Sequence, residues 1–101
     1  MNAATLLDIE AIRLACVQYG VQRLRVFGSV LSDRFDPEHS DIDFLVDFLP
    51  GRSDMFDDYF GLREVLAEIV GREVDLIVAR AVRNPYFKTS AFNSAQDVYA
   101  A

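Results

Sequence analysis

The sequence predicts one α/β (α+β) domain over residues 1–101, with a small mixed β-sheet flanked by helices. Two long segments repeat apolar residues every three or four positions, which is typical of amphipathic helices. Three short apolar runs, rich in β-branched residues and bounded by turn residues, are typical of strands. The chain has 101 residues, of which 51% are hydrophobic, and this length allows one core with little room for a second domain.

Residues that begin and end helices support both helical segments. Residues 4–19 form the first predicted helix, which Gly20 ends. Its apolar stripe contains Ile9, Ile12, Cys16 and Tyr19. The second helix has Ser53 or Asp54 as its N-cap and ends before Gly71. Its stripe contains Met55, Tyr59, Leu62, Leu66 and Ile69.

The predicted strands are residues 23–27, 41–48 and 73–78. An Asn-Pro pair then opens the segment 84–99, where Asn is a good N-cap and Pro is favoured at the first helical position. This pair predicts a last helix or helical turn that runs toward the end of the segment.

Asp41 and Asp43 stand two residues apart at the start of the apolar strand 41–48. Side chains alternate between the two faces of a strand, so both carboxylates lie on one face while Ile42 and Phe44 lie on the other. The pair is therefore a candidate site for a divalent metal ion.

Gly28 and Ser29 follow the strand 23–27 and precede a short helical stretch at 30–34. Backbone amides at such a turn, together with a hydroxyl group, can bind a phosphate. Ser40 is interpreted as a residue that fixes the entry to the acidic strand, with direct contact to a nucleotide as the alternative. The Gly-Ser turn and the acidic pair together predict a metal–nucleotide site.

A third carboxylate, Asp75, lies in the strand 73–78, whose apolar residues at 74, 76 and 78 share the opposite face. If this strand pairs beside the first acidic strand, Asp75 meets Asp41 and Asp43 on one face of the sheet. Three carboxylates suit one or two Mg²⁺ ions, whose remaining ligands are water and substrate phosphates.

Residues 26–48, VFGSVLSDRFDPEHSDIDFLVDF, resemble the signature of the minimal nucleotidyltransferases (MNT) of the DNA polymerase beta superfamily, and Asp75 in VDLIV stands at the place of their third acidic residue. The resemblance covers nearly the whole chain and implies their polymerase beta-like fold. It also implies that the three carboxylates bind Mg²⁺ and are catalytic. Gly28 and Ser29 would hold the β- and γ-phosphates of ATP while AMP is transferred to a hydroxyl group.

The same resemblance implies a partner. MNT proteins pair with HEPN-type ribonuclease toxins in two-gene toxin–antitoxin systems and neutralise them by adding AMP to a toxin tyrosine, so the chain is expected to be a type VII-like antitoxin. Two alternatives stay open: an inactive protein of this fold that inhibits by binding alone, and a small-molecule nucleotidyltransferase. A glycosyltransferase with an Asp-x-Asp motif would need a much larger nucleotide-sugar domain.

Composition limits the remaining classes. A formal net charge of −6 argues against a nucleic-acid partner, because binding a phosphate backbone needs clustered Lys and Arg. The single cysteine, Cys16, excludes an internal disulfide and is expected in the core. No charged-then-apolar leader and no apolar run near eighteen residues is present, so no membrane partner is expected. Together with the family resemblance, this favours the cytoplasm.

Other charged residues have simpler interpretations. Asp57 and Asp58 favour the dipole at the start of the second helix. Asp47 shares a face with Asp43 but is interpreted as a solvated residue or one that protects a sheet edge. A basic group follows the third strand and either meets the triphosphate or a partner, or is ordinary protein surface. It contains Arg80, Arg83 and Lys88.

Overall fold

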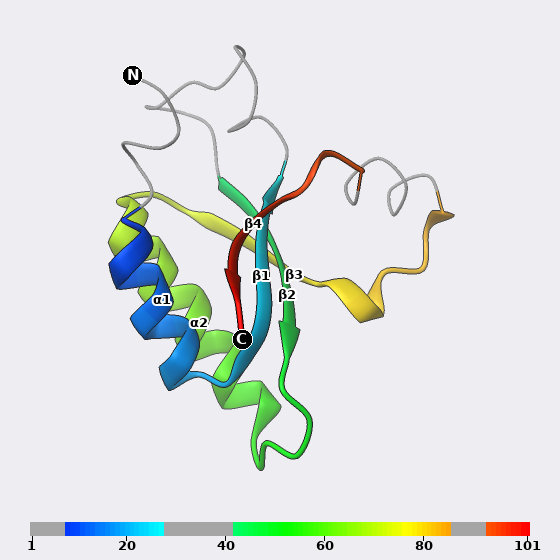
Figure 1. Ribbon diagram of the computed structural model, residues 1–101, viewed down its shortest axis with the longest axis horizontal. Coiled ribbons are helices and arrows are strands. Elements are labelled where there is room, and N and C mark those ends of the chain that lie inside the picture. Colours follow the sequence, from blue (N-terminus) through cyan, green and yellow to red (C-terminus); the bar gives the residue numbers. More distant parts are fainter. Residues whose placement is uncertain (1–7, 28–41, 86–92) are drawn as a thin grey trace.

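The computed structural model describes residues 8–27, 42–85 and 93–101. In this part of the chain, two helices lie side by side on one face of a β-sheet, and a short 3₁₀ turn lies on the other side (Figure 1). The helices are α1 (Ile9–Gln18) and α2 (Met55–Val70), and the turn is η3 (Ala79–Ala81). Both helices thus lie on one face of the sheet. We call the opposite face the open face, because among the described residues η3 is the only complete helical element on it.

The sheet has four strands in the order β3-β2-β1-β4. They are β1 (Val21–Phe27), β2 (Ile42–Phe48), β3 (Val74–Val78) and β4 (Gln96–Ala100). β1 pairs antiparallel with both β2 and β4, whereas β2 and β3 are parallel and are connected through α2. The prediction of a small mixed sheet flanked by helices is confirmed.

The first helix starts later than predicted within the described residues. Asp8 has an extended backbone, and its carboxylate accepts a hydrogen bond from the amide of Ala11 at 3.1 Å, so it is the N-cap. Ile12 and Cys16 are buried, as predicted, and burial raises the pKa of the Cys16 thiol to about 12. Ile9 was wrongly assigned to the apolar stripe, because it lies in the first turn and is 50% exposed.

α2 begins and ends where capping residues predict. The Asp54 carboxylate accepts a hydrogen bond from the amide of Asp57 at 3.0 Å, and Gly71 ends the helix in the left-handed conformation with φ of 71°. Met55 departs from the predicted stripe, since it is exposed in the first turn. Neither helix among the described residues is long and apolar enough to cross a membrane.

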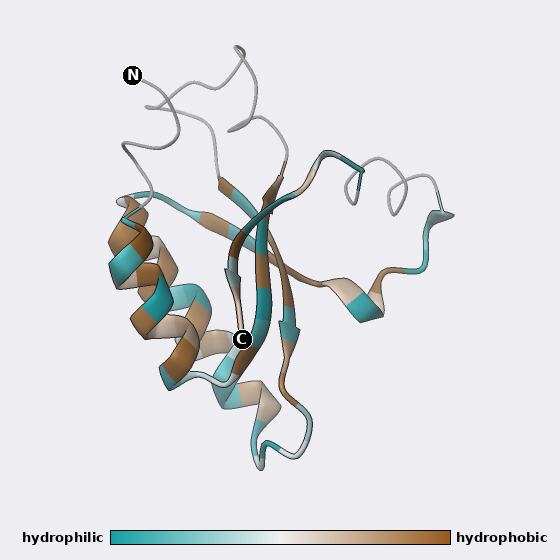
Figure 2. Cartoon of the chain, viewed as in Figure 1, coloured by the Kyte–Doolittle hydropathy of each residue, from teal (hydrophilic) through white to brown (hydrophobic). Residues whose placement is uncertain are grey.

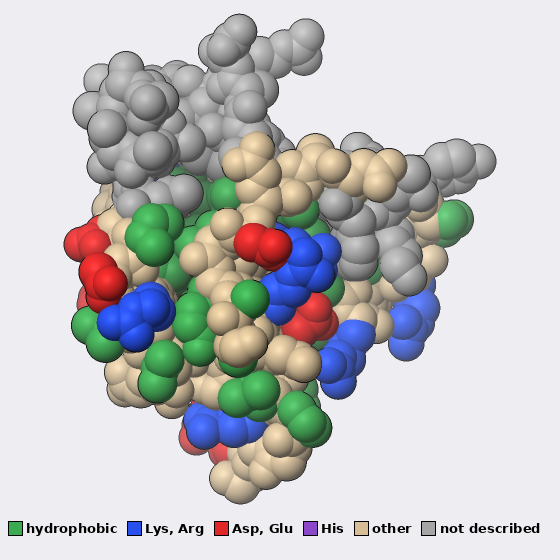
Figure 3. All heavy atoms as spheres, viewed as in Figure 1, with side chains coloured by type: hydrophobic (Ala, Val, Ile, Leu, Met, Phe, Trp, Pro, Cys, Tyr) green, Lys and Arg blue, Asp and Glu red, His purple; other side chains and the backbone are tan. Residues whose placement is uncertain are grey.

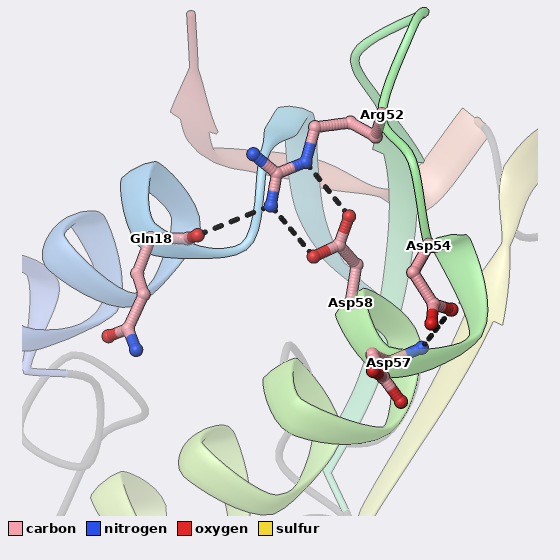
Figure 4. A network of polar contacts seen from close by, with 5 residues as sticks. All are labelled: Gln18, Arg52, Asp54, Asp57 and Asp58. Atoms are coloured by element: carbon pink, nitrogen blue, oxygen red, sulfur yellow. Dashed lines mark hydrogen bonds and ion pairs between the residues drawn. The ribbon is translucent and has the colours of Figure 1, made fainter.

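Polar contacts of Arg52 connect the start of α2 with the end of α1 (Figure 4). Arg52 donates to both carboxylate oxygens of Asp58, at 2.8 and 2.9 Å, and its guanidinium lies 3.5 Å from the carbonyl oxygen of Gln18. Gly20, with φ of 67°, lies against this arginine, and a Cβ there would come within 2.3 Å of the Arg52 Nε. Asp58 therefore does more than favour the helix dipole, because it holds the loop before α2 against the end of α1.

The main core lies between the helices and the sheet. Figure 2 shows hydrophobic residues along both helices and along the strands that they cover. The fully buried side chains of the core come from α1, α2, β1 and β2. They include Ile12, Leu24, Ile42, Phe44, Val46, Leu62 and Leu66. Tyr59 packs against this core and its hydroxyl donates to the carbonyl oxygen of Leu76, which confirms its packing role. The next residue of α2, Phe60, is not part of this core, and its side chain is 45% exposed.

The C-terminal segment differs from the prediction. Helical geometry is described at Pro85 and again at residues 93 and 94, but residues 96–100 form β4 instead of a helix that continues toward Tyr99. Val98 and Tyr99 pack against the main core, and the strand covers the edge of β1. Pairing with a long strand outweighs the local signal of the Asn-Pro pair.

Candidate active site

Asp43 and Asp75 lie next to each other on the open face of the sheet. They are register partners on the parallel strands β2 and β3, and the neighbouring residues of both strands point into the main core. Adjacent strands are ~4.8 Å apart, so the two carboxylates meet on one face. The condition on which the predicted site depends, that the two acidic strands pair, is therefore met.

The other predicted site residues lie outside the described residues. These are Gly28, Ser29, Ser40 and Asp41. The flanking register is nevertheless fixed, because Phe27, the last residue of β1, pairs with Asp43. The segment that carries the Gly-Ser motif and Asp41 thus leaves β1 and enters β2 at the end of the sheet where the two carboxylates lie.

The donor set fits a hard divalent cation. Asp43 and Asp75 offer carboxylate oxygens from a rigid pair of strands, and Mg²⁺ prefers one or two carboxylates with water and phosphate as its other ligands. Within residues 8–27, 42–85 and 93–101, no group of three His, Cys, Asp or Glu side chains is placed to hold a metal. The third predicted ligand, Asp41, belongs to the segment between these ranges.

The open face is organised in rows that follow from the register. Phe27, Asp43 and Asp75 form the first row, which contains the carboxylates. The second row crosses the sheet from β1 to β3 through Arg25, Leu45 and Ile77. A small apolar cluster fills the middle of this face and contains Phe27, Leu45 and Ala79, with Ile77 and Ala95 packed against it. Arg23 and Asp47 form the third row.

Asp47 is not simply a solvated residue, in contrast to its interpretation from the sequence. Its carboxylate lies between two guanidinium groups, 3.7 Å from Arg25 and 3.8 Å from Arg80, and its side chain is 21% exposed. Arg80 also anchors its neighbour, because its carbonyl oxygen accepts a hydrogen bond from Arg83 at 3.1 Å. Lys88, the third residue of this basic group, lies outside the described residues.

Sequence reasoning missed two charged residues of β1. Arg25 is buried beside Asp47, and Arg23 donates to Asp97 of β4 at 2.7 Å. This hydrogen bond lowers the pKa of Asp97, because it stabilises the carboxylate form. The available signal was that Arg23 and Arg25 occupy alternate positions of the strand and therefore share the face of Phe27.

Sequence comparison relates the chain to nucleotide-transferring proteins. The family model described as "Nucleotidyltransferase domain" matches residues 9–98. A protein of Methanocaldococcus jannaschii named "Putative protein adenylyltransferase MJ1379" is 38% identical over 73 residues, which cover 72% of each chain. A second protein of the same organism, named "Putative protein adenylyltransferase MJ0435", is 37% identical over 82 residues, covering 81% of this chain and 84% of its own.

Solved structures with the same fold extend this relationship. One described as a "putative minimal nucleotidyltransferase" has a TM-score of 0.75 and 33% identity, with 95% of each chain covered. A toxin–antitoxin structure with AMP-PNP has a TM-score of 0.68 and 19% identity, covering 94% of this chain and 75% of that one. A third structure is described as a tri-AMPylated Shewanella oneidensis HEPN toxin in complex with MNT antitoxin. Its TM-score is 0.55 and its sequence identity is 17%, covering 92% of this chain and 73% of that one. Because their sequence identity is below 25%, the last two structures show only that the fold is shared.

Proposed function

Because the chain belongs to the nucleotidyltransferase domain family, we propose that it transfers AMP from ATP to a tyrosine hydroxyl of a HEPN-type toxin and so acts as an antitoxin. The observation that carries the proposal is the register of Asp43 with Asp75, which puts two carboxylates side by side on the open face. The relatives named as protein adenylyltransferases support a protein acceptor. The fold shared with a toxin–antitoxin pair whose toxin is AMPylated supports the partner.

Each proposed site residue has a definite task. Asp41, Asp43 and Asp75 would hold Mg²⁺, which when bound neutralises phosphate charge and orients the triphosphate. The Gly28 amide and the Ser29 hydroxyl would bind the β- and γ-phosphates, with Ser40 at the entry to the acidic strand. Asp75 would also help to remove the proton of the acceptor hydroxyl as its oxygen attacks the α-phosphorus and pyrophosphate leaves. Positioning and charge neutralisation would supply most of the rate enhancement.

A melting experiment tests the nucleotide and metal part of the proposal. ATP with Mg²⁺ should raise the melting temperature of the wild-type chain by mass action, and Asp43→Asn should remove the part of this rise that depends on Mg²⁺. Asp97→Asn is the matched control, because Asp97 is a carboxylate of the same face that pairs with Arg23. An equal Mg²⁺-dependent rise in wild type and Asp43→Asn would contradict the metal assignment.

Protection of cells separates catalysis from inhibition by binding. Cells that express the HEPN-type toxin should survive with the wild-type chain but not with the double variant Asp41→Asn, Asp43→Asn. Both substitutions keep the size of the side chain, and Asp43 lies outside the main core, so the fold should persist. Full protection by a folded double variant would favour an antitoxin that works by binding alone.

A further inference from the structure

Three arginines gather on the open face of the sheet, beyond the carboxylate pair. Arg23 and Arg25 come from β1 and Arg80 comes from η3, and they surround Asp47 on β2. We call these three residues the arginine strip. Figure 3 shows Arg or Lys side chains alternating with Asp or Glu side chains across this part of the surface.

The arginine strip borders a hollow of about 470 Å³. Its lining combines residues of three strands and η3, namely Gln22, Arg23, Asp47, Arg80, Ala100 and Ala101. The side chains of Arg80 and Arg23 are 61% and 46% exposed, so their guanidinium groups are accessible from solvent. Asp47 is much less exposed and lies deeper in the hollow, where its carboxylate is 3.7 Å from the guanidinium of Arg25.

The side chains that line the hollow have a charge opposite in sign to that of the whole chain. They include two arginines, Arg23 and Arg80, and one carboxylate, Asp47, which gives one positive charge in a chain of net charge −6. A short acidic peptide segment would touch only this positive area. A long polyanion such as RNA would also meet the negative remainder of the surface. The planar guanidinium of arginine also matches the geometry of a carboxylate.

The distance between the arginine strip and the carboxylate pair determines how many residues of an extended acceptor would lie between them. Asp43 and Asp47 are four residues apart on β2, which corresponds to about 13 Å at ~3.3 Å per residue. An extended acceptor segment would cover the same distance with about four residues. It would pass over Leu45, which is buried in the small apolar cluster and is not itself a contact surface.

We infer that the arginine strip docks an acidic stretch of the acceptor protein about four residues from the hydroxyl that receives AMP. This inference rests on the proposed function for the identity of the acceptor, but the docking step itself needs no nucleotide. It assigns Arg23 and Arg80 to acceptor recognition, with Asp47 and Asp97 as residues that position them.

Binding of synthetic peptides to the full chain tests the inference. One labelled 12-residue peptide carries a single tyrosine with two glutamates starting four positions away, and the second replaces both glutamates by glutamine. By fluorescence anisotropy at low salt, the glutamate peptide should bind about fivefold more tightly, as expected for two partly exposed charge pairs. The double variant Arg23→Gln, Arg80→Gln should lose this preference.

Two further variants test whether a lost preference results from a general loss of positive charge or of stability. Arg13→Gln removes an arginine of α1 that is similarly exposed and also ion-paired, with Glu10, and should keep the full preference. Arg80→Gln alone leaves the Arg23–Asp97 pair between β1 and β4 intact and should weaken the preference without lowering the melting temperature. Equal affinity of the wild type for both peptides would overturn the inference. So would a preference that survives in the folded double variant, or an oligouridylate that binds the arginine strip more tightly than the glutamate peptide.

Transfer of AMP to the tyrosine of the same peptides is measured separately, so the two ideas can fail independently. Arginine-dependent binding without any AMP transfer would contradict the proposed function and leave the docking surface standing. Transfer at equal rates to both peptides would support the proposed function and overturn the docking surface.

Discussion

Replacing Asp75 by asparagine should stabilise the protein in the absence of nucleotide. Asp75 and Asp43 are like charges directly opposite each other on neighbouring strands, ~4.8 Å apart at the backbone. Coulomb's law in a water-like dielectric gives about 0.8 kcal/mol at ~5 Å, and screening at physiological salt reduces this repulsion to about 0.5 kcal/mol. For a domain of this size, that corresponds to a rise in melting temperature of about 2–4 °C.

Thermal unfolding followed by circular dichroism measures this effect. The control Asp97→Asn removes a carboxylate from the same face, but one that accepts a 2.7 Å hydrogen bond from Arg23, so it should lower the melting temperature. High salt should shrink the gain of Asp75→Asn. With ATP and Mg²⁺ present, the order of wild type and Asp75→Asn should reverse, because the wild type alone keeps both ligands. A lower melting temperature for nucleotide-free Asp75→Asn would refute the reasoning that repulsion between these two carboxylates destabilises the folded chain.

Three other changes test the packing. Leu62→Ala removes a fully buried side chain of α2 and should lower the free energy of unfolding by about 2–5 kcal/mol in urea denaturation, and a loss below ~1 kcal/mol would contradict its core position. Gly61→Ala should destabilise α2 despite the better helix propensity of alanine, because the new Cβ would lie 2.4 Å from the Tyr19 ring, and Tyr19→Ala in the same chain should relieve the loss. Arg52→Ala should reduce stability most at neutral pH. The Arg52 hydrogen bonds lower the folded-state pKa of Asp58, so this stabilisation is present above the unfolded pKa and is lost as pH falls through the folded one. The wild type and the variant should therefore converge in acid unfolding curves.

Local rules predicted much of the fold. The N-cap of α2 was predicted at Ser53 or Asp54 and its end before Gly71, because capping depends on only a few neighbouring residues. Side-chain alternation likewise placed Asp43 and Asp75 on the face opposite the core. The fold class followed from these patterns. The pairing of the two acidic strands was only a condition of the predicted site, and its parallel direction was not predicted.

Features that depend on distant partners could not be predicted. Residues 96–100 form a strand because β1 offers them an edge, which no local pattern records. Asp58 is buried because Arg52 reaches it from the preceding loop, and Asp47 contacts arginines from two other elements. In each case the sequence shows the charge, but the folded chain determines its partner.

Intact mass spectrometry of the partner tests the central claim most directly. The HEPN-type toxin, incubated with ATP, Mg²⁺ and the wild-type chain, should gain the mass of at least one AMP group, located on a tyrosine by fragmentation. The double variant Asp41→Asn, Asp43→Asn should give no gain at equal concentration and with an unchanged circular dichroism spectrum. A toxin whose mass stays unchanged with the wild-type chain, while cells are still protected, would contradict the proposal that this nucleotidyltransferase modifies its partner.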